Sequence, residues 1–372
     1  MTAREPVTRH APGKLFIAGE YAVLEPGHPA ILVAVGRGVA VTVSATTGAD
    51  VVVESDLHPA ATRLRRRDGE LAGIGADDAH RAQESLGQVT SAIEVVDQLL
   101  AERGRRMPPI RVSITSHLHR DGTKLGLGSS GAVTVATVAA VAAYCGLDLS
   151  QYARYRLAML AAARRDPGGS GGDLAAGVWG GWIAYRAPDR TAVLDLAQRH
   201  GIEESMRVPW PGFGLRRLPT PRGLALEVGW TGQPVSSATL TGRLGTGRWW
   251  GSTAQQRFAA RSDTCVLAAI RALERGDDGQ LLQQIRTARR LLADLDDQLR
   301  LGIFTTRLTA LCDAAEAAGG AAKPSGAGGG DCGIALLDAT ATREISQLRR
   351  EWAAAGVLPL STHLQPTNRS AA

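Results

Sequence analysis

The stretch GTKLGLGSSGAVTVATVAAVAAY, residues 122 to 144, passes from glycines and serines straight into an apolar segment of helical composition. Such a junction presents consecutive backbone N–H groups and the positive end of a helix, an arrangement that binds phosphate. Ser130 adds a hydroxyl that is a candidate ligand for Mg²⁺. The alternative is that the glycines only permit a tight turn before a packed helix. We predict a polyphosphate-binding loop formed by Gly126, Leu127, Gly128, Ser129, Ser130 and Gly131.

Each lysine of this chain lies inside or next to a glycine-rich segment. Lys14, Lys124 and Lys323 are its three lysines, against 39 arginines. A compact ammonium group is hard to replace with arginine where it must contact one phosphate oxygen. The pattern therefore favours phosphate chemistry at these three positions. Compositional drift toward arginine is the alternative.

Three further glycine-containing segments accompany this loop. APGKLFIAGEYAV (residues 11–23) precedes it, and AKPSGAGGGDCGIAL (residues 322–336) offers a second backbone nest that a ligand can approach closely. A flexible linker is the alternative for the second nest, but a predicted strand follows it at once. Between these segments, DPGGSGGD ends in Asp173, which we predict to be the catalytic carboxylate. Its alternative is a helix N-cap.

Better known nucleotide motifs do not apply. Residues 126–131 fit G-x-G-x-x-G, but a dinucleotide site needs a strand directly before the glycines, and here a polar turn precedes them. No lysine follows the Walker A spacing. His119-Arg120-Asp121 lacks the partner motifs of a protein kinase.

The composition indicates a two-domain cytoplasmic protein. A chain of 372 residues exceeds one comfortable core. The net charge of +6 comes from dispersed arginines, so it supports nucleic-acid binding weakly and fits an anionic small-molecule substrate equally well. The cysteines have neither metal-ligand nor disulfide-framework spacing, and no apolar run approaches the length of a membrane span. We expect no nucleic-acid or membrane partner, and a monomer or homodimer.

Hydrophobic periodicity and turn residues predict an α+β fold. We place the domain boundary near residue 190, which gives domains of residues 1–190 and 191–372. An arginine-rich loop is expected up to Ser85, and Ser150 is expected to cap a helix. Strands are predicted at residues 30–45, 50–54, 110–115, 182–186, 223–230, 332–337 and 358–363. Helices are predicted at residues 89–102, 131–144, 151–165, 253–275, 279–299, 305–318 and up to 355, with a helical turn from 173.

Together these motifs resemble those of the galacto-, homoserine, mevalonate and phosphomevalonate (GHMP) kinase superfamily. P-G-K followed by G-E, then G-L-G-S-S, then a C-terminal glycine-rich stretch occur in order from Pro12 to Leu336. The segments GEYAV, GTK, GSGGD, GWTG and SGAGGGDC are most similar to those of bacterial-type phosphomevalonate kinases. The resemblance implies an N-terminal domain like ribosomal protein S5 domain 2 and a ferredoxin-like C-terminal domain. ATP and the acceptor would bind in the cleft between them.

The reaction implied by this resemblance transfers the γ-phosphoryl group of ATP to 5-phosphomevalonate in the mevalonate pathway of isoprenoid biosynthesis. The products are 5-diphosphomevalonate and ADP. Asp173 would orient the acceptor or take a proton. Lys14, as a second catalytic residue, would screen the repulsion between the two phosphates, and Lys124 would clamp the acceptor phosphate. The cofactors implied are ATP and Mg²⁺, with Ser130 as a metal ligand. The expected substrate-binding residues are Lys14, Glu20, Tyr21, Lys124, Ser170, Lys323, Ser325, Gly326, Ala327 and Gly328.

One departure narrows the choice of acceptor. Mevalonate kinases carry a Mg²⁺-binding glutamate about one helix length before the catalytic aspartate, whereas residues 161–165 are alanines and arginines. This departure counts against mevalonate kinase itself. The alternatives are another small-molecule kinase of the superfamily and a catalytically silent, metabolite-binding relative.

Overall fold

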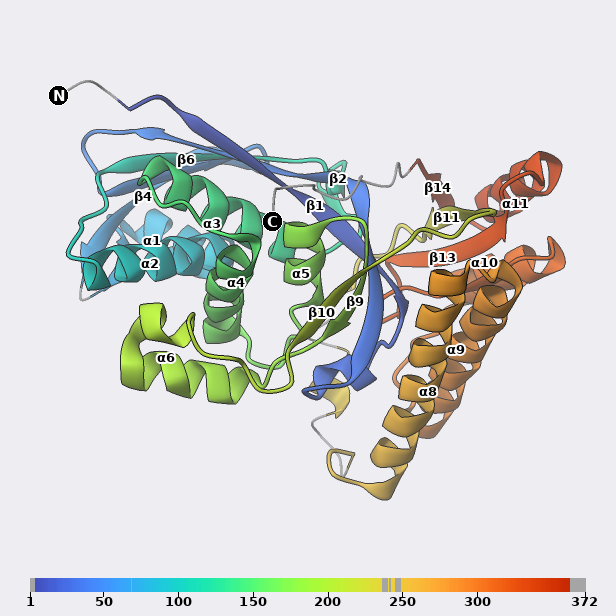
Figure 1. Cartoon of the computed structure of the whole chain (residues 1–372). Coiled ribbons are helices and arrows are strands. Elements are labelled where there is room, and N and C mark those ends of the chain that lie inside the picture. The colour runs from blue at the N-terminus through green and yellow to red at the C-terminus, as the bar shows by residue number, and fades with distance from the viewer. Residues whose placement is uncertain (1–3, 68, 236–239, 241, 245–248, 362–372) are drawn as a thin grey trace.

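The protein consists of two parts, each built on its own main sheet (Figure 1). The structure is a computed structural model that describes residues 4–67, 69–235, 240, 242–244 and 249–361. Strands and helices mix without a regular alternation, so the expected α+β class is confirmed.

The first sheet is organised around one long strand. β2 (Pro29–Ala45) pairs with β1 (Val7–Ala18), β6 (Ile110–Ser116) and β9 (Trp182–Arg186), all antiparallel. β10 (Gly214–Leu218) extends the sheet beyond β9. β3 (Val51–Ser55), β4 (His58–Arg67) and β5 (Glu70–Gly73) extend it beyond β6. The valines of β2 at positions 39, 41 and 43 are buried, and the residues between them are partly exposed, as expected for a strand with one covered face.

Four helices cover the inner face of this sheet (Figure 1). They are α2 (Gly87–Glu102), α3 (Ser129–Tyr144), α4 (Gln151–Arg165) and α5 (Gly172–Trp179). α3 packs on β1 and β2 and is buried along nearly its whole length, which explains its Ala/Val composition. Because α3 and α5 both pack on β1, their first turns lie near the strand that carries Lys14.

The second part is a four-stranded antiparallel sheet in the order β12-β13-β11-β14. Its strands are β11 (Leu224–Trp230), β12 (Ala321–Pro324), β13 (Cys332–Asp338) and β14 (Leu358–Leu360). The long helices α8 (Thr253–Arg275) and α9 (Asp278–Leu299) pack side by side, and α10 (Thr306–Ala317) and α11 (Thr342–Ala354) complete this part (Figure 1). Buried residues of both parts belong to one continuous apolar cluster, so the two sheets are held against each other.

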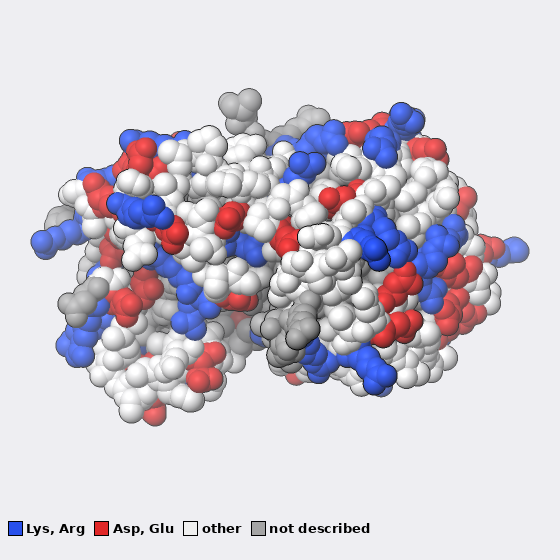
Figure 2. All heavy atoms as spheres, turned by 90° about the horizontal axis from the view of Figure 1, so that it is seen from below, with Lys and Arg blue, Asp and Glu red and all other residues white. Residues whose placement is uncertain are grey.

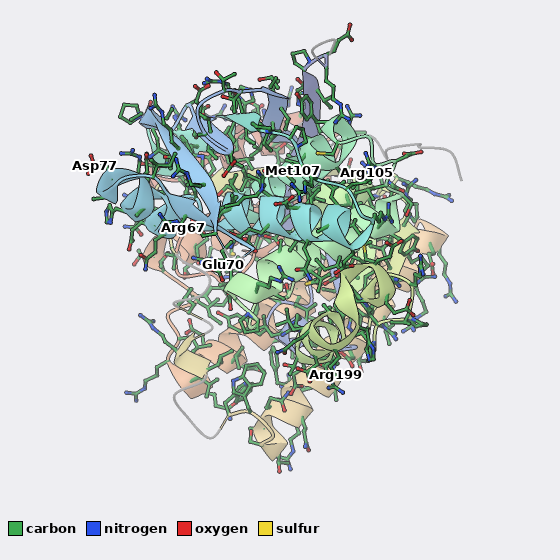
Figure 3. All side chains as sticks on the ribbon, turned by 90° about the vertical axis from the view of Figure 1, so that its left-hand side faces the viewer. Arg67, Glu70, Asp77, Arg105, Met107 and Arg199 are labelled. Carbon is green, nitrogen blue, oxygen red and sulfur yellow. The ribbon has the colours of Figure 1, made fainter. Side chains whose placement is uncertain are left out.

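The prediction of an irregular loop up to Ser85 was wrong. This segment contains β4, β5 and the helix α1 (Ala76–Glu84). In β4, Thr62 and Leu64 point inward while Arg63 and Arg65 are exposed, so the strand alternates normally. Figure 3 shows Arg67, Glu70 and Asp77 on this side of the molecule. Its polar residues occupy the outer positions of an edge hairpin, where charge blunts further strand pairing.

The chain leaves the first sheet later than the boundary predicted at residue 190. The helix α6 (Arg190–Ser205) packs on α2 and α4, and β10 pairs with β9. The second sheet begins at Leu224. We therefore propose a boundary between Leu218 and Leu224.

Most other predicted elements are confirmed within a few residues. The Ser150 hydroxyl accepts a hydrogen bond from the Ala153 N–H at 3.2 Å and caps α4, as predicted. β14 ends at Leu360, and the last two positions of the strand predicted for residues 358–363 lie outside the described residues.

Candidate active site

A cavity of about 570 Å³ opens between the two parts, a volume suited to a small-molecule ligand. Its wall is formed by β1, the first turns of α3 and α5, and the glycine-rich segment between β12 and β13. The predicted site residues that line it are Lys14, Glu20, Tyr21, Lys124, Gly126, Gly128, Ser129, Ser130, Gly131, Ser170, Asp173, Gly326 and Ala327. The predicted residues Leu127, Lys323, Ser325 and Gly328 do not line it.

The predicted phosphate loop has a backbone that favours glycine at two positions. Gly126 and Gly128 have φ values of 73° and 78°, and Gly128 is the N-cap of α3. The side chain of Leu127, between them, is buried, and its carbonyl accepts a hydrogen bond from the Lys14 N–H at 2.8 Å. This bond fixes the loop to β1. Leu127 is therefore an anchor of the loop, and Ser129 and Ser130 open α3 toward the cavity.

Asp173 faces the phosphate loop at close range. A Cβ atom on Gly131 would lie 2.4 Å from the Asp173 carboxyl carbon, and one on Gly128 would lie 3.1 Å from Lys14 Cε. Glycine at these positions lets Lys14 and Asp173 approach the first turn of α3. Asp173 is the second residue of α5, whose N-cap is Gly171, and its carboxylate accepts from the Leu174 N–H at 3.0 Å. Asp173 is therefore not the N-cap of α5, which was the alternative role considered for it.

The environment of Asp173 raises its pKa above the ordinary value. Desolvation by burial is the main cause, and the Lys14 ammonium and neighbouring backbone N–H groups oppose it. A carboxyl group with a raised pKa beside a lysine in a cavity is typical of a functional site. The Lys14 ammonium also lies 5.2 Å from the centre of the Phe16 ring, which limits where it can move.

Lys124 lines the cavity from another pair of strands. It lies on β8 (Thr123–Lys124), which pairs with β7 (His119–Arg120), and its side chain is exposed. Burial and the nearby Lys124 ammonium lower the pKa of His119. An exposed lysine at the rim is placed to attract an anion from solvent.

The predicted substrate residues of the first and last motifs divide into two groups. Lys323 is fully buried and donates to the Glu20 carboxylate and, at 2.7 Å, to the Pro324 carbonyl. The Ser325 hydroxyl donates to the Phe16 carbonyl at 3.0 Å and accepts from the Phe16 N–H at 2.9 Å. These contacts join the two parts of the molecule. Lys323 and Ser325 are thereby turned away from the cavity, while Gly326 and Ala327 remain on its wall.

The sequence reasoning missed several residues of the cavity wall. Asp331 has φ of 50°, and a Cβ atom on Gly126 would lie 2.4 Å from its carboxyl carbon. Burial raises the pKa of Asp331, and the Lys14 and Lys124 ammonium groups oppose the shift. Gln88 also lines the cavity, and its side-chain oxygen accepts from the Thr134 hydroxyl at 3.3 Å. Asp331 could have been predicted as a site residue, because it is an acidic residue within a glycine-rich segment. No feature of the sequence around Gln88 indicates a role in the site.

Two observations concern other classes of ligand. On the face shown in Figure 2, lysine and arginine side chains are mixed with aspartate and glutamate and form no single basic patch. Among the described residues, no helix combines the length and apolar character needed to cross a membrane.

Comparison with known proteins gives matches over nearly the whole chain. The family model described as GHMP kinases N terminal domain matches residues 89–181, and the one described as GHMP kinases C terminal matches residues 269–354. A phosphomevalonate kinase from Streptomyces sp. (strain CL190) is 61% identical over 363 residues, which cover 96% of this chain and 97% of the relative.

Solved structures also match this chain over nearly its whole length. Streptococcus pneumoniae phosphomevalonate kinase in complex with phosphomevalonate and AMPPNP superposes with a TM-score of 0.84 and 27% identity, covering 96% of this chain and 100% of that one. A Lin0012 protein from Listeria innocua superposes with a TM-score of 0.87 and 32% identity, covering 97% and 98%.

Proposed function

This chain belongs to the GHMP kinase family, and on that premise we propose that it is a phosphomevalonate kinase. The observation that carries the proposal is the 61% identity to a phosphomevalonate kinase over nearly the full length of both chains. The cavity supports it, because Lys14, Ser130 and Asp173 converge on the first turn of α3. Three retained functional groups in one cavity also argue against a catalytically silent relative.

The proposed reaction moves the γ-phosphoryl group of ATP to an oxygen of the terminal phosphate of 5-phosphomevalonate. The bond between the γ-phosphorus and the β,γ-bridging oxygen breaks, the new bond to the acceptor oxygen forms, and ADP leaves. Such a transfer depends on positioning and charge neutralisation. The acceptor phosphate has a second pKa of about 6, so it is largely a dianion at neutral pH and needs no strong base.

Each charged group in the cavity has a role in this scheme. The backbone N–H groups of residues 126–131 would bind the ATP phosphates at the positive end of α3. Lys14 would reduce the repulsion between the donor and acceptor phosphates, and Lys124 would draw in the acceptor from the rim. Asp173 would orient the acceptor or take its remaining proton. The Gly326–Ala327 backbone would close the site from the second part of the molecule.

The residues present fit Mg²⁺ bound chiefly through ATP. Mg²⁺ is usually held by one or two protein oxygens together with phosphates and water, and it supplies charge neutralisation when bound. The exposed Ser130 hydroxyl and the Asp173 carboxylate meet that requirement. Among the described residues, no group of three or more His, Cys, Asp and Glu could hold a metal ion. These two side chains would hold the ion together with the phosphates of ATP.

We also propose that the protein is located in the cytoplasm. All four cysteines are free and buried, which supports a reducing compartment.

An ADP-release assay with ATP and Mg²⁺ tests the function. We expect rapid turnover with 5-phosphomevalonate and much slower turnover with mevalonate, because the residues proposed to face the acceptor suit a phosphorylated group. Equal turnover of both acceptors would favour a less selective kinase of the family. ADP release with neither, while ATP still binds, would favour a silent metabolite-binding protein.

A further inference from the structure

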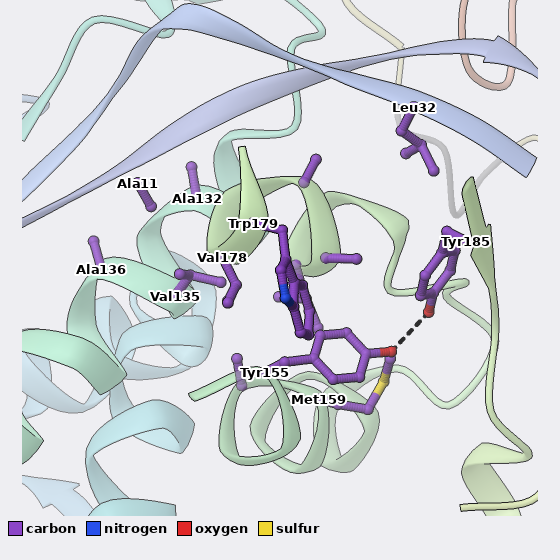
Figure 4. Packing of buried hydrophobic residues seen from close by; sticks show 14 of the residues in the cluster. Ala11, Leu32, Ala132, Val135, Ala136, Tyr155, Met159, Val178, Trp179 and Tyr185 are labelled. Carbon is purple, nitrogen blue, oxygen red and sulfur yellow. Dashed lines mark hydrogen bonds between the residues drawn. The ribbon is translucent and has the colours of Figure 1, made fainter. Parts of the chain in front are cut away.

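Two buried tyrosines, Tyr155 and Tyr185, lie side by side in the core (Figure 4), and Tyr185 contacts the loop that leads to Asp173. The hydroxyls of Tyr155 on α4 and Tyr185 on β9 are 2.8 Å apart. The Tyr185 hydroxyl also donates to the carbonyl oxygen of Ser170 at 2.6 Å. Because Tyr185 has one hydroxyl proton and gives it to Ser170, Tyr155 must be the donor in the tyrosine pair.

Both phenols remain protonated at neutral pH. Burial raises the pKa of Tyr155 and of Tyr185 above the ordinary phenol value. The Tyr185 proton is therefore always available to the Ser170 carbonyl.

The hydrogen bond from Tyr185 fixes the orientation of the next peptide group. The described residues have no cis peptide bonds, and in a planar trans peptide the C=O and N–H groups point in opposite directions. With the Ser170 carbonyl directed into the core, the Gly171 N–H points to the other side. Ser170 and Gly171 line the cavity, so that side is the cavity. No acceptor for the Gly171 N–H occurs among the described residues.

The loop has little stiffness of its own, so it depends on such contacts. Residues 166–173 include four glycines, whose backbones lose more conformational freedom on ordering than those of other residues. Gly171 has φ of 69°, and a Cβ atom on it would lie 2.0 Å from Met159 Cε. The loop thus rests directly on Met159 and Tyr185. The buried Arg190 holds its beginning through the Pro167 carbonyl at 3.1 Å.

We propose that Tyr185 is a positioning residue, which turns the Ser170–Gly171 peptide so that the Gly171 N–H binds the phosphate group of the acceptor. This inference rests on the proposed function and identifies a backbone donor for the group that distinguishes phosphomevalonate from mevalonate. Without the Tyr185 hydroxyl, the Ser170 carbonyl loses its partner in the core. The flexible peptide can then rotate and withdraw its N–H from the cavity.

The test compares Tyr185→Phe with Tyr155→Phe, two variants that each delete one buried hydroxyl of the same pair. In Tyr185→Phe we expect the KM for 5-phosphomevalonate to rise about tenfold, which corresponds to about 1.4 kcal/mol. The KM for ATP should stay unchanged. In Tyr155→Phe the bond from Tyr185 to Ser170 survives, so the KM for both substrates should stay near the wild-type value. Calorimetric titration of phosphomevalonate should give the same difference in Kd.

The stability of the variants is measured alongside, because a structural role alone would lower the unfolding temperature without this KM difference. If Tyr185→Phe fails to fold, the Tyr155→Phe/Tyr185→Phe double variant replaces it, since it leaves no phenol hydroxyl without its partner. The same rise in the KM for phosphomevalonate is then expected relative to Tyr155→Phe.

Two results would overturn the inference. If the wild-type enzyme turns over phosphomevalonate but the Tyr185 and Tyr155 variants have equal KM values, the positioning role is wrong while the function stands. If the wild-type enzyme neither binds nor phosphorylates phosphomevalonate, the proposed function fails and the inference fails with it.

Discussion

Lys323 and Glu20 form an ion pair in the interior of the protein, although 303 residues separate them in the sequence. Both side chains are buried, and Glu20 also accepts from the Gly326 N–H at 3.4 Å. Because Glu20 belongs to the first part and Lys323 to β12 of the second, the pair fixes the cavity wall across the two parts. A buried ion pair of this kind fixes the relative position of the two parts more than it stabilises the fold, because desolvation of the two charges offsets much of their attraction.

Breaking this pair from one side should therefore be strongly destabilising. Lys323→Met leaves the Glu20 carboxylate buried without its cation, and we expect the free energy of unfolding to fall by about 3–5 kcal/mol. Adding Glu20→Gln removes the buried charge and should recover most of the loss. Urea unfolding measures both values. The control is Arg199→Ala, which removes an exposed pair with Asp195 and should change the stability by less than about 1 kcal/mol. Similar losses for the two single variants would contradict the prediction.

Asp173→Asn tests proton removal against orientation. If the carboxylate accepts a proton during transfer, kcat should fall by roughly 10²–10⁴, with the KM for phosphomevalonate little changed. Single-turnover kinetics and a binding titration separate the two effects. Retained kcat would reduce Asp173 to an orienting group.

The raised pKa of Asp173 also predicts a pH dependence. In the enzyme without bound substrates the carboxylate predominates only above that pKa, so kcat/KM, which reports the free enzyme, should fall as the pH falls through it, at a higher pH than for an ordinary aspartate. In Asp173→Asn this fall in kcat/KM should vanish, and only the titration of the acceptor phosphate near pH 6 should remain. The effect of Asp173 on folding stability has the opposite pH dependence. Folding favours the neutral form, so this contribution to stability is present at low pH and is lost as the pH rises through the folded-state pKa.

Lys14→Arg and Lys124→Arg test whether a compact ammonium is required. Lys14 lies deep in the cavity, so the larger planar group should lower kcat. Lys124 lies at the rim and should mainly raise the KM for phosphomevalonate when replaced. Arg65→Lys on the exposed face of β4 is the matched control and should leave both constants unchanged. Wild-type constants for both site variants would mean that the lysine pattern reflects composition alone.

Gly131→Ala tests the close approach of Asp173 to α3. The new methyl group would meet the carboxyl group at 2.4 Å, so we expect a large loss of kcat. Alanine is favoured over glycine within a helix by about 1 kcal/mol, so part of the strain should be offset and the fold retained. Gly279→Ala on α9 is the control, because its nearest neighbour would be an Asp277 oxygen at 3.7 Å. The comparison uses steady-state kinetics and thermal unfolding, and equal kcat values would argue against the contact.

Ser130→Ala tests the metal role of the hydroxyl. We expect a higher Mg²⁺ concentration for half-maximal turnover, with a loss of stability no greater than about 2 kcal/mol, the upper range for a hydroxyl at a helix start. Titrating Mg²⁺ at saturating ATP measures the first effect, and thermal unfolding measures the second. An unchanged Mg²⁺ requirement would assign Ser130 a structural role.

Residue patterns within short stretches predicted the features that depend on neighbouring residues. The Ser150 cap, the helices α3, α8 and α9, and the glycines of the phosphate loop follow from hydrogen bonds and backbone preferences within a few residues. Proximity in the sequence also linked Lys124 to the phosphate loop. Local patterns therefore predicted most of the helices and strands, together with a site for phosphate chemistry.

Tertiary structure alone decided which of these residues share the cavity. Lys323 and Ser325 belong to the predicted motif, yet pairing with Glu20 and Phe16 directs them into the interface. The arginines of β4 made this strand resemble a polar loop in the sequence. Which of its residues face inward depends on pairing with β3, which the arginines do not reveal. The orientation of the Ser170 carbonyl depends on Tyr185 from another strand. Such contacts join distant segments, so their outcome is set by how the whole chain packs, which no short stretch of sequence specifies.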